Sequence, residues 1–227
     1  TEWYLIMSAL IGNPLLLTTA PSAGDGTYQI ERSLRFNSAD SPTLSRTPGT
    51  SGNRRTYTIS WWQKKHFVTV PSNANCAIIS ARTDDNNHFT LGIENDGGAN
   101  HTSKQSGTSE LSVGTGAEKF NDTNAWLHYC VVVDTTNAIQ AERFKVYING
   151  ENRFTAGTRF DQNDLTEWNK SGVAHVLGAS GQSSWGHPDI TLADIQHIDG
   201  LALSPAAFGS FDSLNVWNPK AFELPTP

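Results

Sequence analysis

The stretch WLHYCVVVDTTNAIQAERFKVYING, which runs from Trp126 to Gly150, constrains the fold more strongly than any other part of the chain. Residues 127–134 are rich in β-branched and aromatic side chains, and residues 144–148 alternate between apolar and polar, which is the period of a β-strand. Asn149 and Gly150 then supply two residues that tolerate the positive φ angles of a tight hairpin turn. The stretch therefore predicts two strands joined by a polar loop and followed by a hairpin turn.

Short strands separated by polar turns are predicted along most of the remaining chain. Nine further segments have a strand pattern, namely residues 33–36, 43–46, 57–63, 77–81, 89–93, 110–113, 153–156, 174–178 and 190–198. Helical patterns are confined to single turns at residues 163–168 and 205–208. The 19 Gly and 10 Pro residues suit many chain reversals. The fold class that follows is all-β, a two-sheet antiparallel sandwich, with Trp61 and Trp126 expected in its core.

The 227 residues suit one main domain with an extension at each end. We predict an N-terminal docking arm over residues 1–30, a sandwich domain over residues 31–210 and a C-terminal arm over residues 211–227. The N-terminal segment carries Glu2 and is interrupted by Gly12-Asn13-Pro14, so we expect an arm rather than a signal peptide or a membrane span. The apolar side chains expected to make assembly contacts are Trp3, Tyr4, Leu5, Ile6, Leu15, Leu16, Leu17, Trp217, Phe222 and Leu224.

Charge and cysteine content narrow the range of partners and settings. Sixteen basic and 22 acidic residues give a net charge of −6, which argues against nucleic acid and against an anionic membrane surface as partners. Cys76 and Cys130 both fall in predicted strands, where we expect buried free thiols. A disulfide between them is the alternative, and it would have to meet a strict Cα spacing.

Four stretches of the chain carry a more specific resemblance. They are residues 33–65 (beginning SLRFNSAD), 126–150, 173–180 (VAHVLGAS) and 192–222 (containing HIDGLALSPAAFGS and ending WNPKAF). Together they resemble the laminin-G-like, concanavalin A-like jelly-roll modules of tailed-phage virion proteins. The resemblance implies a jelly roll in a capsid decoration, head-fibre or tail-fibre protein, assembled in the host cytoplasm and located in the virion. Other copies of the chain and other virion proteins would be its partners.

Residues for catalysis are hard to find in the sequence. The Glu-x-Asp-x-x-Glu pattern of the laminarinase-like branch does not occur, and the five-residue spacing of Asp194 and Asp199 would put them on opposite faces of an uninterrupted strand. Cys130 lies near His128, but nothing marks an electropositive site that would activate a thiolate. We predict that the protein is not an enzyme.

Calcium is the one cofactor that the resemblance raises, because laminin-G-like domains often bind it. The candidates are Asp84, Asp85, Asn87 and Asp96, which lie in neighbouring loops. Such Asx-rich loops also form turns for reasons of their own backbone. We therefore expect no cofactor and leave Ca²⁺ as the alternative.

Glycan contact would need an exposed aromatic ring with polar neighbours. Trp185 lies in a polar loop, and its neighbours Gln182, His187 and Asp189 could donate or accept hydrogen bonds. The same tryptophan could instead anchor the loop or contact another subunit. The leading hypothesis is thus a non-enzymatic virion structural protein, with glycan contact as an additional role; a carbohydrate-binding adhesion module is the second, and a secreted polysaccharide-degrading enzyme the third.

Overall fold

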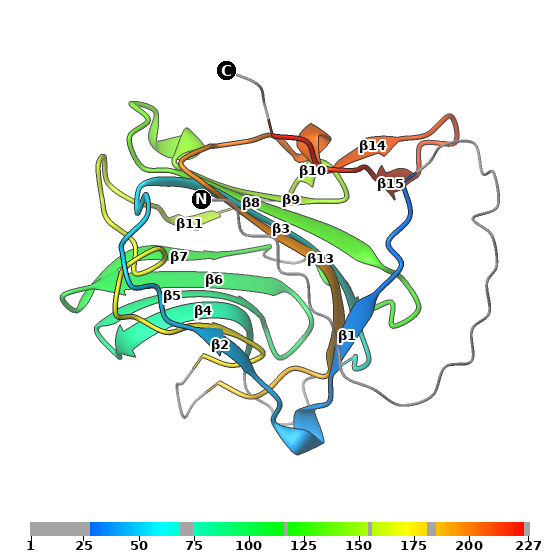
Figure 1. Ribbon diagram of the computed structural model, residues 1–227, viewed down its shortest axis with the longest axis horizontal. Coiled ribbons are helices and arrows are strands. Elements are labelled where there is room, and N and C mark those ends of the chain that lie inside the picture. The colour runs from blue at the N-terminus through cyan, green and yellow to red at the C-terminus, as the bar shows by residue number, and fades with distance from the viewer. Residues whose placement is uncertain (1–27, 69–74, 116–117, 154–155, 181–184, 225–227) are drawn as a thin grey trace.

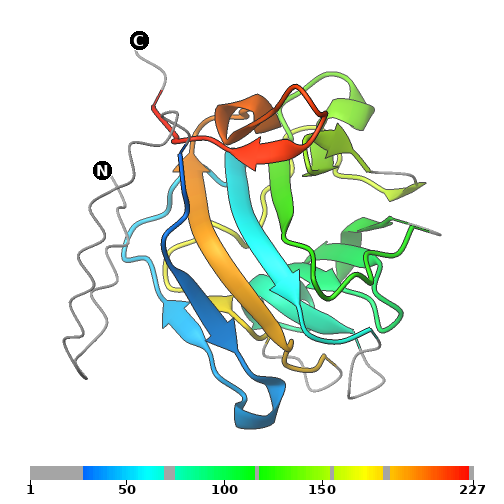
Figure 2. The same cartoon turned by 90° about the vertical axis from the view of Figure 1, so that its right-hand side faces the viewer.

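Two large antiparallel sheets face each other in the protein (Figures 1 and 2). The computed structural model describes residues 28–68, 75–115, 118–153, 156–180 and 185–224. The helices in these residues are single 3-10 turns, η1 (Ser38–Asp40), η2 (Gln140–Glu142) and η3 (Pro205–Ala207). None of them is long and apolar enough to cross a membrane. The predicted all-β, two-sheet antiparallel sandwich is confirmed.

The first sheet has six strands. Its order is β1 (Ser33–Phe36), β13 (Ile190–Asp199), β3 (Thr56–Lys65), β8 (Leu127–Asp134), β9 (Phe144–Ile148) and β10 (Glu151–Asn152). Two of its neighbouring strands, β1 and β13, come from the beginning and the end of the domain's sequence. The hairpin predicted from the opening motif is present, with φ angles of 50° at Asn149 and 79° at Gly150. Strand β13 contains a bulge between Ala193 and Gln196, where Asp194 has a φ of 46°.

The second sheet has seven strands, four of which follow one another along the chain. Its order is β11 (Ala156–Thr158), β7 (Thr108–Gly114), β6 (Ala99–Gln105), β5 (Asn87–Ile93), β4 (Cys76–Asp84), β12 (His175–Leu177) and β2 (Leu44–Arg46). Strand β6 was not predicted, because polar residues occupy both of its faces. It nevertheless pairs with β5 and β7 over most of its length.

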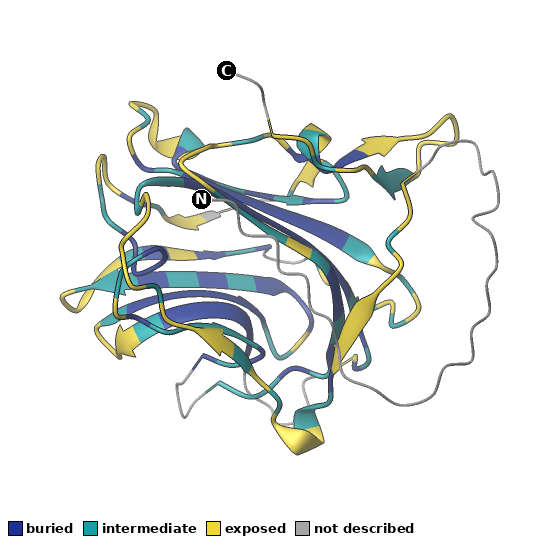
Figure 3. Cartoon of the chain, viewed as in Figure 1, coloured by how far each residue is buried: buried dark blue, intermediate teal, exposed yellow. Residues whose placement is uncertain are grey.

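The main core lies between the two sheets, where the strands are dark blue in Figure 3. Alternate residues of β3, namely Tyr57, Ile59 and Trp61, are at most 1% exposed, as their alternation predicts. Trp126 was predicted in the core, but its side chain is 38% exposed because it precedes the first residue of β8. Cys76 and Cys130 are free and buried, and burial raises the pKa of both thiols to about 12.

The C-terminal segment folds back on its own chain instead of extending as an arm. Strands β14 (Gly209–Phe211) and β15 (Trp217–Pro219) form a hairpin over the outer face of the six-stranded sheet (Figure 2). The Trp217 indole N–H donates to His128 Nδ1 at 3.1 Å, and Phe222 stacks on Phe208 with centroids 5.1 Å apart. These contacts complete a second hydrophobic cluster around Cys130 and Val132.

Residue 210, the predicted domain boundary, lies inside β14, and Trp217 and Phe222 contact residues of the same chain. Contacts of these side chains with other subunits stay a prediction. Leu224 is 51% exposed. The N-terminal side chains from Trp3 to Leu17 lie outside the described residues.

Two helical turns were predicted, and one is present. Pro205–Ala207 forms the turn η3, opened by Ser204 with proline at the first position. Residues 163–168 are not helical, because Asn163 adopts a left-handed φ of 69° and the backbone N–H of Asn163 donates to the Thr135 carbonyl. That segment belongs to a loop between β11 and β12, which also borders the site described below.

Substituting Gly150 by alanine is expected to lower the free energy of unfolding by about 3 kcal/mol, from the left-handed backbone and from displacement of a packed ring. Gly150 has a φ of +79°, and a Cβ there would lie 2.4 Å from Trp217 Cζ3. Gly200→Ala is the matched control, because Gly200 has a φ of +83° but no heavy atom within 4 Å of its Cβ position. Urea unfolding of both variants measures the difference, and equal losses would contradict close packing of Trp217 on the β9–β10 turn.

Candidate functional site

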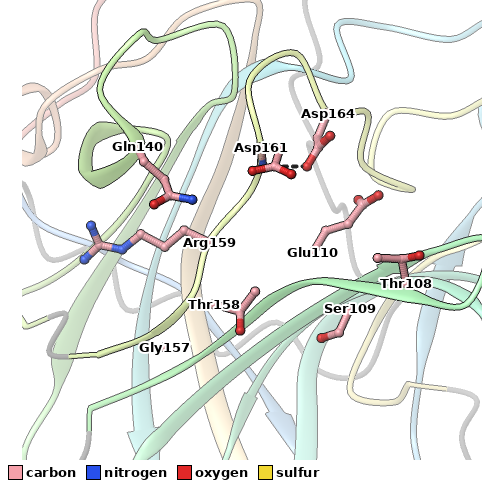
Figure 4. A pocket seen from close by; sticks show the side chains of 9 residues that line it. All are labelled: Thr108, Ser109, Glu110, Gln140, Gly157, Thr158, Arg159, Asp161 and Asp164. Carbon is pink, nitrogen blue, oxygen red and sulfur yellow. Dashed lines mark hydrogen bonds between the residues drawn. The ribbon is translucent and has the colours of Figure 1, made fainter.

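A polar pocket of about 290 Å³ lies at the β11 edge of the seven-stranded sheet (Figure 4). The start of β7, the end of β11, η2 and the following loop line it with Thr108, Ser109, Glu110, Gln140, Gly157, Thr158, Arg159, Asp161 and Asp164. The three carboxyl groups gather on one side, across from Ser109 and Thr158, while the Arg159 guanidinium points away from them. Its lining is rich in hydroxyl, amide and carboxyl groups, and its volume is near the lower end of the range for ligand sites.

The carboxyl groups of the pocket influence one another's ionisation. Burial, followed by the charges of Asp164 and Asp161, raises the pKa of Glu110 to about 7. Burial is also the main cause that raises the pKa of Asp164 above its ordinary value. Asp164 Oδ2 accepts a hydrogen bond of 2.6 Å from the Asp161 backbone N–H, and Glu110 Oε2 is buried without a hydrogen-bond partner in the described residues. Near neutral pH the pocket therefore contains a carboxyl group that can donate as well as accept.

A buried arginine fixes the backbone around the pocket. Arg143 is only 8% exposed, and its guanidinium donates to the carbonyls of Asn137, Ala138 and Phe160. These bonds hold the loop that contains η2 against the residue that precedes Asp161. The side of the pocket formed by Gln140 and Asp161 is thus positioned by hydrogen bonds from one guanidinium.

A row of hydroxyl side chains runs from the pocket across the outer face of the seven-stranded sheet. Direct register partners on five adjacent strands form this hydroxyl row, which consists of Ser80, Thr90, Thr102, Ser112 and Thr158. The row points away from the core, because the residues next to it on each strand, such as Leu91 and His101, face the interior. Ser112 and Thr158 are exposed and Thr102 is partly exposed, whereas Thr90 and Ser80 are buried, and the Ser80 hydroxyl donates to the Ala179 carbonyl.

Trp185 lies beside this row, on the same face of the sheet. A Cβ on Gly92 would lie 2.4 Å from Trp185 Cζ3, so the indole packs where β5 has no side chain. Gly92 is two residues along β5 from Thr90, which is about 7 Å. Trp185 is half-buried and could therefore still offer part of its ring to a ligand.

The other residues predicted beside Trp185 are engaged elsewhere. His187 Nδ1 lies 3.0 Å from the Gly178 carbonyl, and Asp189 forms an ion pair with Arg35. Gln182 lies outside the described residues. Of the predicted glycan contacts, the described residues thus place only Trp185 beside the hydroxyl row.

The calcium candidates do not come together. Asp84 ends β4, Asp85 lies in the turn and Asn87 begins β5, whereas Asp96 follows the other end of β5. Asp84 accepts hydrogen bonds from Asn87 Nδ2 and the Asn86 backbone N–H, and Asp85 pairs with Arg82. In the part of the chain that the structure describes, no group of three or more His, Cys, Asp or Glu side chains is arranged to hold a metal ion.

The ammonium group of Lys119 lies beside Asp96, at the place where a bound cation would lie. Asp96 borders an open hollow formed with Asn75, Glu94 and Asn95. Lys119 Nζ lies 2.8 Å from Asp96 Oδ2 and 3.3 Å from Glu94 Oε2. The lysine thus pairs with both carboxylates and offsets one of their two negative charges.

The carboxyl groups of the pocket were not identified from the sequence. Glu110 lies at the start of a predicted strand, while Asp161 and Asp164 lie in a loop about fifty residues later. The only local signal is the i, i+3 spacing of the two aspartates, which is also common in turns. Pairing of β7 with β11 brings the two segments together.

Comparison with known proteins places the chain within a sequence family. Residues 36–199 match the family described as the concanavalin A-like lectin/glucanases superfamily, of the Laminin_G_3 type. No curated protein matches the chain.

Solved structures share the fold at low sequence identity. The binding domain of botulinum neurotoxin serotype D is 15% identical with a TM-score of 0.53, covering 83% of this chain and 45% of that one. Domain 4 of AbnA, a GH43 extracellular arabinanase from Geobacillus stearothermophilus solved with arabinotriose, is 20% identical with a TM-score of 0.50, covering 77% and 73%. A heptameric SAP-like pentraxin from Limulus polyphemus is 20% identical with a TM-score of 0.49, covering 72% and 71%.

Proposed function

Because the chain belongs to the concanavalin A-like lectin/glucanases superfamily, we propose that it is a non-enzymatic structural protein of a tailed-phage virion that binds a glycan through its seven-stranded sheet. The observation that carries the glycan part is the continuity between the pocket and the hydroxyl row, which share Thr158. Hydroxyl, amide and carboxyl groups arranged on rigid strands suit a ligand that is itself a set of hydroxyl groups.

Binding would use the exposed end of the sheet. Glu110, in its protonated form, would donate to a sugar oxygen, while Asp161 would accept from a sugar hydroxyl. Thr102, Ser112 and Thr158 would continue the hydrogen bonds along the outer face. Trp185 would contact the apolar face of a sugar ring at the side of the row.

Trp185→Ala is expected to weaken glycan binding roughly tenfold, from the loss of about 1.4 kcal/mol of ring contact. Trp126→Ala is the matched control, because that indole is exposed on a different part of the molecule and should leave the affinity unchanged. The wild type is first screened on an array of bacterial surface polysaccharides, and titration calorimetry then measures both variants. A wild type that binds no glycan would contradict the proposed binding function; unchanged binding by Trp185→Ala would exclude only that residue.

Hydrolysis of a glycan in the same pocket is a second candidate, favoured by the raised pKa of Glu110, which is in the range of a general acid. Glycosidases that use two carboxyl groups combine a protonated acid with an ionised partner. The sequence lacks the Glu-x-Asp-x-x-Glu pattern of the laminarinase-like branch, which is why we favour binding. We expect no release of reducing ends from any glycan bound on the array; release that Glu110→Gln abolishes would establish catalysis instead.

The virion setting is proposed from the sequence motifs, and one surface feature supports it. The β14–β15 hairpin, which belongs to the closing motif, presents Phe211, Leu214 and Val216 with exposures of 44%, 81% and 53%. Exposed apolar side chains on a rigid hairpin suit contact with another protein. Electron microscopy of particles from the source culture, labelled with an antibody against residues 30–205, tests the location. Label on heads or tails is expected, whereas unlabelled particles with the chain in the medium would favour a secreted lectin.

A further inference from the structure

Asn169 joins three parts of the chain at the end of the sandwich. It adopts a left-handed φ of 64°, and its carbonyl accepts from the Gly52 backbone N–H at 2.9 Å. Its side-chain amide donates to the Asn53 carbonyl at 2.8 Å and to Asp199 Oδ1 at 3.0 Å. Its backbone N–H donates to His175 Nε2 at 2.8 Å. A histidine ring thus accepts the bond that ties Asn169 to β12.

The protonation state of His175 follows from its two hydrogen bonds. Nδ1 lies 2.9 Å from the Val173 carbonyl, which can only accept, so Nδ1 carries a proton. Nε2 accepts from the Asn169 N–H, so it is unprotonated. A second proton on the ring would make Nε2 a donor that faces the donor N–H of Asn169, and the bond between them would break.

The surroundings of His175 disfavour that second proton. The charged and titratable groups around His175 in the described residues are Arg46, its register partner on β2, and His197 on β13. Arg46 is cationic, and His197 becomes cationic when it is protonated. Burial, and then the charge of Arg46, lower the pKa of His175, while the bond to the Val173 carbonyl raises it. The carboxylates on the adjoining segments are already bonded, Asp199 to Asn53 and Asn169 and Glu167 to Lys170. The Trp168 ring packs on His175 with centroids 4.4 Å apart.

From Asn169, a series of hydrogen bonds leads along the loop to the pocket. Residues 52–55 and 163–169 run side by side. We call the hydrogen bonds between these two segments, which begin with the Gly52–Asn169 bond, the zipper. Beyond the Gly52–Asn169 bond, Thr166 N–H donates to the Arg54 carbonyl at 3.1 Å, and Arg54 Nε donates to the Thr166 carbonyl at 2.7 Å. Arg55 Nε donates to the Asn163 carbonyl at 2.8 Å, next to the pocket residue Asp164.

We propose that His175 is a proton-operated latch: a second proton on its ring breaks the bond that ties Asn169 to β12, which weakens the zipper at that end and loosens the loop that places Asp161 and Asp164 in the pocket. The latch itself stands on the hydrogen bonds alone. Its consequence, weaker ligand binding in acid, rests on the proposed function. The proton would come from solvent, and return to neutral pH would close the latch again.

Hydrogen exchange of the whole, ligand-free protein tests the latch independently of any glycan. Between pH 7.5 and 5.5, after correction for the intrinsic pH dependence, exchange in residues 163–172 is expected to accelerate at least tenfold more than exchange in residues 127–134 of β8, which follows the global loss of stability. His175→Gln keeps an acceptor and a donor without a titrating ring, and its loop should show no acceleration. His66→Gln, at a partly exposed histidine bonded to Thr191, is the matched control and should behave as the wild type.

Three outcomes would overturn the proposal. They are a wild-type loop whose corrected exchange is constant, a His175→Gln loop that accelerates like the wild type, and equal acceleration in β8, which would mean global unfolding. If His175→Gln does not fold, ¹⁵N NMR of the histidine rings in the wild type decides.

At pH 8, the His175 ring is expected to carry its proton on Nδ1. On acidification, protonation of Nε2 should be accompanied by a shift of the Asn169 amide resonance. A proton on Nε2 at pH 8 would contradict the latch.

Discussion

Lowering the pH from 7 to 5 is expected to reduce the free energy of unfolding by about 6 kcal/mol, which is comparable with the whole stability of many domains. Four histidines carry the effect. Burial is the largest cause in each case, and it lowers the pKa of His88, His128 and His197 to about 4 and that of His101 to about 3. Acid unfolding should therefore begin above the range in which ordinary carboxylates titrate.

The sign of this effect follows from which state binds the proton. In the unfolded chain each histidine takes up a proton near pH 6.5, whereas in the folded protein it stays neutral until about pH 4 or below. Stability is thus complete above pH 6.5 and is lost as the pH falls toward 4, by about 2 kcal/mol per histidine at pH 5. Glu110 acts in the opposite direction and offsets about 2 of the roughly 8 kcal/mol from the four histidines, because its folded pKa of about 7 lies above its unfolded value.

Urea unfolding followed by tryptophan fluorescence, at half-unit steps from pH 7.5 to 4.5, measures the loss. His101→Leu is the informative variant, because both ring nitrogens of His101 are buried without side-chain hydrogen bonds to the described residues and its neighbours Leu91 and Val113 are apolar. The variant should lose less stability in acid than the wild type, by about 2 kcal/mol at pH 5. A stability that is constant between pH 7 and 5 would show that these rings are not held neutral.

The second large effect is expected for Glu167→Ala, with a loss of about 3–5 kcal/mol. The Glu167 side chain is 1% exposed and pairs with Lys170 at 2.9 Å and Arg54 at 3.4 Å. It also accepts a hydrogen bond of 2.8 Å from the Thr83 hydroxyl. Removing the carboxylate leaves the Arg54 charge, on a side chain that is 17% exposed, without this partner.

Glu142→Ala is the matched control for Glu167→Ala. Glu142 pairs with Lys145 at 2.8 Å, also three residues away, but its side chain is 43% exposed. Such surface pairs contribute roughly 0–1 kcal/mol, so this variant should unfold at nearly the wild-type urea concentration. Similar losses for the two variants in equilibrium unfolding would argue against a special role for the buried carboxylate.

Most of the strands could be predicted because their alternation is local. The segments 33–36, 127–134 and 144–148 have the predicted bounds, since apolar side chains there alternate or cluster without interruption. Strand β6 was missed for a physical reason. Its inward side chains include His101 and Ser103, so no apolar face distinguishes it from a loop.

The candidate site was much harder to predict because strand pairing creates it. Glu110 and Asp164 meet only because β11 pairs with β7, and nothing near either residue encodes that contact. The calcium candidates Asp84 and Asp96 show the opposite relation between sequence and space. They are close in sequence, but a whole strand separates them, and a strand of seven residues spans about 20 Å.

The order of the strands also affects how the chain can fold during synthesis. The four strands β4 to β7 are consecutive in sequence and adjacent in their sheet, so this half can form as soon as residue 114 leaves the ribosome. The other sheet must wait, because β13 lies between β1 and β3, and Ser33 pairs with Ala193. Until residue 199 emerges, β1 and the adjoining edge of β3 lack their native partner, and unpaired strand edges of this kind favour aggregation.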